Sequence, residues 1–119
     1  MRLNEELRAR TKAFASAIIR AYIHLPNGRD EVAVLGKQML RSGTSVASHT
    51  REASRARSDS EFCSKLDGLL QEADETQLWI ELLIEDCQIQ DPNLPAIHRE
   101  TGELIAIFTT IVSKVRRSL

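Results

Sequence analysis

Apolar residues recur every three or four positions along most of this sequence, which is the spacing of one face of an α-helix. The clearest series begins at Phe62 and continues to Cys87 in a strict four-three alternation. Comparable series extend from Leu3 to Leu25, from Val32 to Ala53 and from Ile97 to Val115. The pattern predicts four amphipathic helices.

Turn signals separate these series. Pro26-Asn27-Gly28 ends the first, because proline cannot continue the hydrogen-bond ladder and Asn-Gly tolerates turn dihedral angles. Ser58 and Glu61 have the spacing of a capping box before the third series, and Pro95 falls in the first turn of the fourth. We expect helices over about residues 3–25, 30–56, 59–89 and 94–117, in a single domain spanning residues 1–119.

Four long helices joined by short links predict an all-α fold, an up-down-up-down antiparallel four-helix bundle. The composition agrees, because aromatic residues make up only 4% of the chain and there are 5 glycines and 3 prolines. Such a composition favours helices packed through aliphatic side chains over a sheet protein with many turns. A chain of 119 residues suffices for one core and is too short for two.

The net charge of −1 conceals an uneven distribution. Residues 1–58 carry 11 basic and 5 acidic side chains, residues 59–91 carry 1 and 10, and residues 92–119 carry 4 and 2. The third predicted helix is therefore acidic, and its outward face can meet a basic surface of another subunit, such as the first helix. The carboxylates of that face are Asp67, Asp74, Glu81 and Glu85.

Nothing in the sequence indicates a membrane span or export. The longest charge-free apolar stretch, from Leu104 to Ser113, is about half of what a bilayer requires. The first residues are charged and lack an apolar segment before a cleavage site, so we expect a cytoplasmic protein. Cys63 and Cys87 stand far apart without metal-ligand spacing, which predicts two buried thiols and no metal or cofactor.

One stretch of the second predicted helix is unusually polar. Arg41, Ser45 and His49 follow one another at intervals of four and form a ridge. Our structural interpretation is a hydrogen-bonded network between helices in which Arg41 pairs with Glu75 and fixes the register. The network is predicted to comprise Arg41, Ser45, His49, Glu52, Glu75 and Thr76.

A catalytic interpretation of the same ridge would use His49 and Glu52 as an acid–base pair, because their spacing of three permits contact. No adjacent nucleophile, glycine-rich phosphate loop or third orienting group accompanies them. Two ligands are also too few for a metal site. We therefore expect no enzymatic activity and assign no catalytic residue.

A spaced set of short elements extends over about half of the chain, from the first predicted turn into the third predicted helix. They are Leu25-Pro26, the QMLRS run from Gln38 to Ser42, Ser45-Val46-Ala47, Glu52, Ser58, Glu61-Phe62 and Glu75-Thr76. This pattern resembles the bacterial four-helix-bundle proteins encoded in intervening sequences of 23S ribosomal RNA genes. These are relatives of the accessory variability protein of diversity-generating retroelements.

The resemblance implies a homo-oligomer, with a pentamer favoured, and nucleic acid as the partner proposed for the retroelement relatives. For the intervening-sequence branch it implies no established activity. Two positions depart from the family pattern, since His49 stands where asparagine is usual and Ala53 where glycine is usual.

Arg51, Arg55 and Arg57 flank the predicted turn between the second and third helices. A charge run at such a place is most often a solvated loop. Alternatively, a ring of five subunits would gather about fifteen positive charges near one rim, enough for phosphate binding. Other cations could join this rim if the chain ends approach it: Arg8, Arg10, Lys12, Lys114, Arg116 and Arg117.

Two hypotheses for function follow. The first is a non-enzymatic, homo-oligomeric scaffold or adaptor that binds the RNA or DNA backbone through this basic rim. The alternative is a self-assembling protein–protein interaction module, for example a reverse-transcriptase accessory, without direct nucleic-acid binding. A pI near 6.3 and the absence of aromatic residues among the basic ones count against the first.

Overall fold

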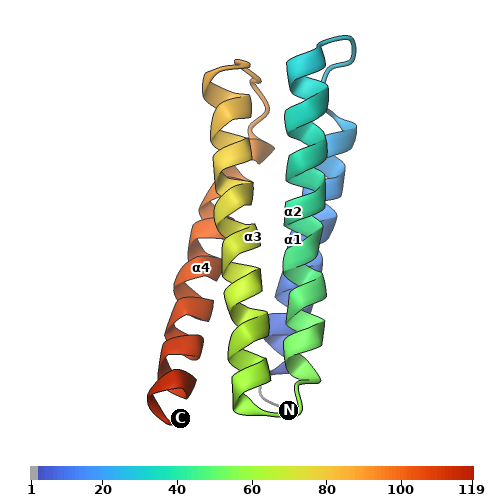
Figure 1. Cartoon of the computed structure of the whole chain (residues 1–119). Helices are drawn as coiled ribbons and strands as arrows, with labels where there is room; N and C mark the ends of the chain where they lie inside the picture. The colour runs from blue at the N-terminus through green and yellow to red at the C-terminus, as the bar shows by residue number, and fades with distance from the viewer. Residues whose placement is uncertain (1–2) are drawn as a thin grey trace.

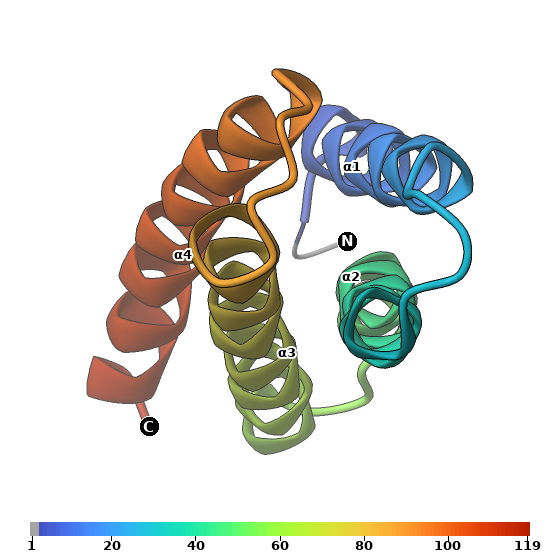
Figure 2. The same cartoon turned by 90° about the horizontal axis from the view of Figure 1, so that it is seen from above.

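The computed structural model describes residues 3–119, which form an antiparallel bundle about 49 Å long. Its helices are α1 (Glu5–Ile23), α2 (Asp30–Ser54), α3 (Asp59–Glu85) and α4 (Asn93–Arg117), and they run alternately up and down (Figure 1). The predicted all-α, up-down-up-down bundle is thereby confirmed. Each helix packs against its neighbour in sequence, whereas α1 and α4 meet over a shorter stretch. Figure 2 shows the reason, because α4 leans away from α1 and α2 toward its C-terminal end while it stays beside α3.

The helix ends follow local hydrogen bonding. Asn4 precedes α1 and accepts the backbone N–H of Leu7 at 2.8 Å, and Ser58 caps α3 by accepting that of Glu61 at 3.0 Å. The predicted α3 was four residues too long, because the helix ends at Glu85 and Gln88 turns the chain with a φ of 58°. The first two helices likewise end two residues before the predicted positions.

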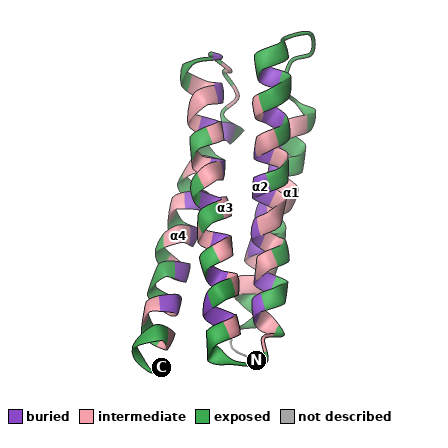
Figure 3. Cartoon of the chain, in the orientation of Figure 1, coloured by how far each residue is buried: buried purple, intermediate pink, exposed green. Residues whose placement is uncertain are grey.

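The inward faces of the four helices form one apolar core. Phe62 and Phe108 are the largest fully buried side chains, and the buried positions lie on the sides of the helices that face each other (Figure 3). Cys63 and Cys87 are buried free thiols, as predicted. Within residues 3–119, we find no helix with the length and hydrophobicity needed to cross a membrane.

The backbone of α2 approaches α1 closely at Gly43. A Cβ atom at this position would lie 2.8 Å from Cγ1 of Ile18, a side chain that is fully buried. Only a residue without a side chain leaves room for Ile18 here, because packed cores have few voids into which a displaced atom can move. The contact therefore ties the last third of α1 to the middle of α2.

We predict that Gly43→Ala destabilises the fold by about 1–3 kcal/mol, because the new methyl group overpacks Ile18. Urea unfolding followed by circular dichroism would measure the change. Gly102→Ala serves as the control, since the added Cβ would meet only Gln77 Nε2, at 3.2 Å, and alanine favours the helix by up to about 1 kcal/mol. Equal midpoints for the two variants would contradict a close helix contact at Gly43.

Candidate nucleic-acid interface

A basic groove lies between the first half of α1 and the last half of α2. Antiparallel packing brings Arg8 and Lys12 of α1 beside Arg51 of α2 and Arg55, which directly follows α2, although the two pairs are about forty residues apart in sequence. Two adjoining hollows of about 290 and 330 Å³ share three of these cations. Between the cations the lining consists mainly of small residues: Ala9, Ala47, Ser48 and Ser54.

Carboxylates of the protein neutralise little of the charge of the four cations in this basic groove. Arg8 Nη2 lies 3.8 Å from a Glu5 carboxylate oxygen, a distance too long for a hydrogen bond. Lys12, Arg51 and Arg55 form no ion pair with any residue from 3 to 119. The positive potential of the groove is therefore largely uncompensated.

Arg10 was grouped with these cations in the sequence, but it points toward α4. Its Nε and Nη2 atoms donate to both carboxylate oxygens of Glu100, at 2.8 and 2.7 Å, and Nη2 also donates to Glu103 at 3.1 Å. The hydrogen bonds to Glu100 raise the pKa of the Arg10 guanidinium. Arg10 thus fastens α1 to α4, and we leave it out of the candidate interface.

The cations at the end of α4 form a separate group. Figures 1 and 2 show this end beside the start of α3, on the far side from α1 and α2. Arg116 pairs with Asp67 of α3 at 2.8 Å, which raises the pKa of the arginine, while Lys114 and Arg117 have no ion pair among the described residues. Arg57 lies exposed in the turn between α2 and α3. The nine predicted cations are therefore not brought to one rim.

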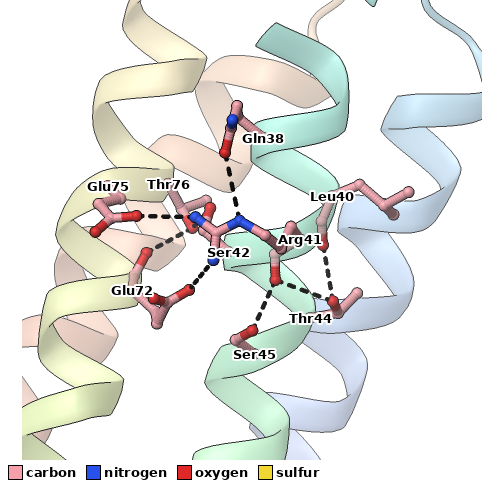
Figure 4. Close-up of polar contacts among 9 residues, drawn as sticks. All are labelled: Gln38, Leu40, Arg41, Ser42, Thr44, Ser45, Glu72, Glu75 and Thr76. Atoms are coloured by element: carbon pink, nitrogen blue, oxygen red, sulfur yellow. Dashed lines mark hydrogen bonds and ion pairs between the residues drawn. The ribbon is translucent and has the colours of Figure 1, made fainter. Parts of the chain in front are cut away.

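Arg41 connects α2 to α3, and Figure 4 shows its contacts. Its Nη2 atom donates to Glu75 at 3.0 Å and Nη1 donates to Glu72 at 3.1 Å, while Nε donates to Gln38 at 3.3 Å. The structure thus brings the predicted pair Arg41 and Glu75 together and adds Glu72. Sequence reasoning missed Glu72, although it stands three residues before Glu75 and so shares its helix face.

A buried hydroxyl pair lies next to this contact. The hydroxyl oxygens of Ser42 and Thr76 are 2.7 Å apart, and Thr76 donates its own proton to the Glu72 carbonyl, so Ser42 is the donor between them. Ser42 was not among the predicted network residues. Ser45 takes no part between helices, because its hydroxyl donates to the Arg41 carbonyl at 2.8 Å.

The lower part of the ridge forms a second contact of its own. Lys65 of α3 lies 3.2 Å from Glu52, whose other oxygen is 3.2 Å from His49 Nδ1. That nitrogen is buried and makes no aligned hydrogen bond. The imidazole packs over Gly68 of α3, where a Cβ atom would lie 3.0 Å from the ring. His49 and Glu52 therefore join α2 to α3. Five of the six predicted residues take part in separate contacts between these helices, and Ser45 takes part in none.

The acidic face of α3 is partly used within the chain. Asp67 pairs with Arg116, and a carboxylate oxygen of Glu81 lies 2.8 Å from His98 Nε2. Asp74 and Glu85 are exposed and form no ion pair among the described residues.

These features define the class of protein: an antiparallel four-helix bundle in which four cations line a groove between two of the helices. Residues 5–110 match the model of the 23S rRNA-intervening sequence protein family, and the chain belongs to this family.

A similar solved structure is that of a protein of unknown function from the S23 ribosomal protein family of Bacteroides thetaiotaomicron. It shares 36% sequence identity and a TM-score of 0.80, and the match covers 88% of this chain and 96% of that one. A comparison with curated proteins returned no significant match.

We predict that Arg41→Ala destabilises the protein by about 1 kcal/mol. The side chain is 53% exposed, so water weakens its ion pairs, but Glu72 is only 16% exposed and loses its cation. Thermal and urea unfolding would measure the effect. Arg116→Ala should shift the midpoint less, since both members of its pair are half exposed. An unchanged midpoint for Arg41→Ala would show that Arg41 does not stabilise the α2–α3 contact.

Proposed function

We propose that this protein is a non-enzymatic, homo-oligomeric scaffold or adaptor that binds the RNA or DNA backbone through the basic groove. The observation that carries this proposal is the state of the four groove cations. Most other arginines that contact a carboxylate do so at 2.7–3.1 Å, whereas the groove holds Lys12, Arg51 and Arg55 without one. Phosphate groups would supply the missing negative charge.

The lining of the groove favours recognition of the backbone over recognition of bases. It contains charged residues, alanines and serines but no aromatic side chain on which a base could stack. Contacts to phosphate fix the position of a nucleic acid without reading its sequence. We therefore propose binding with little sequence preference.

Exposed apolar residues support self-assembly. Ile19 and Ile23 of α1 are 43% and 68% exposed, and Leu78 of α3 is 46% exposed. If the exposed apolar face of α1 in one copy contacts the exposed apolar face of α3 in the next copy, the same contact repeats around the assembly and can close into a ring. Five copies, the number favoured by the family resemblance, would multiply a groove that is weak in a single chain.

The same apolar residues favour a second candidate function. A protein partner, such as a reverse transcriptase, could bind them while the oligomer makes no direct contact with nucleic acid. The two functions differ in their dependence on salt, because apolar contacts do not weaken as ions screen charge.

We predict that labelled RNA and DNA strands are retarded by the protein in gel electrophoresis at low salt and are released as salt is raised. The expected slope of log affinity against log salt is about −3 for each bound copy, from four phosphate contacts on a single strand at about −0.7 each. Absence of binding at low salt would refute nucleic-acid binding and leave the protein-interaction module.

We predict that light scattering at two salt concentrations gives one discrete mass, several times 13.4 kDa. Ile23→Ser should shift the mass toward the monomer, because it removes the most exposed apolar side chain of α1. Val34→Ser is the control, since Val34 is similarly exposed but lies on α2. A monomeric wild-type protein would contradict self-assembly.

A further inference from the structure

We infer that the basic groove holds one phosphodiester strand along the axes of α1 and α2, and that Glu5 competes with this strand for Arg8. The inference rests on the proposed nucleic-acid binding and adds the form of the ligand, its site and the residue that opposes it.

The cations form two rows that suit a linear polyanion. Arg8 and Lys12 are four residues apart on α1 and so span about 6 Å along it, while Arg51 lies in the last turn of α2 and Arg55 directly follows the end of that helix. Arg51 lines both hollows together with Arg8 and Lys12, whereas Arg55 lines only one. The positive charge is thus spread along the groove, where successive phosphates of one strand can each meet a cation.

The floor of the groove limits the ligand to one strand. Ala9, Ala47 and Ser48 are short, so the helices can pack closely while leaving a shallow channel between the longer basic side chains. A single backbone can lie in such a channel. A duplex presents a convex surface and would touch only the cations at the rims, so it should gain less from the groove.

A free hydroxyl group adds a donor for phosphate oxygen. Ser54 donates its proton to the Thr50 carbonyl at 2.9 Å, which leaves it only as an acceptor. The Ser48 hydroxyl, in contrast, makes no hydrogen bond with any of residues 3–119, and Ser48 lines the hollow beside Arg8, Lys12 and Arg51. Its hydroxyl can donate to a phosphate that these cations hold.

Glu5 is the only carboxylate that lines the groove within the described residues. Its side chain is 92% exposed and stays 3.8 Å from Arg8 Nη2. The pair is therefore loose and costs little to separate. A phosphate that approaches Arg8 would replace this carboxylate and be repelled by it, so Glu5 lowers the affinity of the groove.

The test measures fluorescence anisotropy of a labelled oligothymidylate with the full-length protein at fixed salt, beside a duplex of the same length. The single strand should bind more tightly than the duplex. Arg51→Gln/Arg55→Gln should weaken strand binding about tenfold or more, since it removes two phosphate contacts. Lys114→Gln/Arg117→Gln removes the same charge on the far side of α3 and should weaken binding less than about twofold.

Glu5→Gln should tighten strand binding about two- to fivefold. Glu6→Gln is the matched control, because it changes the net charge equally at an exposed residue that does not line the groove, and it should leave the affinity nearly unchanged. Circular dichroism of each variant verifies that the helices are intact, and the gain expected for Glu5→Gln cannot arise from misfolding.

The outcomes separate the two proposals. A wild-type protein that binds neither strand nor duplex refutes nucleic-acid binding itself. Binding that is equally sensitive to the α4 variant, or that favours the duplex, or that is unchanged by Glu5→Gln, overturns the groove assignment while nucleic-acid binding stands.

Discussion

The packing of Ile18 of α1 on Gly43 of α2 determines where the basic groove forms. Because the two helices are antiparallel, positions equally far from this contact lie side by side. Arg8 lies ten residues before Ile18, and Ala53, flanked by Arg51 and Arg55, lies ten residues after Gly43. A slip of α2 by one turn would separate these cations. A steric contact deep in the core thus sets the electrostatics of a surface some three turns away.

Polar contacts between α2 and α3 fix the register in which these two helices pack. Apolar burial holds helices together but distinguishes neighbouring registers poorly, because the apolar positions of each helix repeat. The hydroxyls of Ser42 and Thr76 meet only in this register, and a displaced register would leave the buried Ser42 hydroxyl without this partner. The ion pair of Arg41 with Glu75 supports this register at the same level, and the packing of His49 on Gly68 supports it at another level. Since α2 contacts both α1 and α3, its position places three of the four helices.

Periodicity sufficed to predict the helices, because each buries one continuous apolar stripe. It predicted the ends less well, since the turn at Gln88 depends on local backbone geometry that no proline or glycine marks. The site was harder. The spacing of two residues between Arg8 and Arg10 already separates them around a helix, but only the placement of Glu100 on α4 shows where Arg10 points. The tilt of α4, which carries Lys114 and Arg117 away from the groove, has no counterpart in the local pattern.

Net charge is a poor guide to the surface of this protein, because its carboxylates are positioned unevenly. Glu100 and Glu103 hold Arg10, Glu72 and Glu75 hold Arg41, and Asp67 holds Arg116. Each of these pairs joins two helices. Along the groove between α1 and α2, Glu5 is the sole carboxylate among the described residues, and it faces four cations. A chain with a net negative charge can therefore present a basic channel, because almost all of its carboxylates lie elsewhere in the bundle, several of them in pairs that join helices.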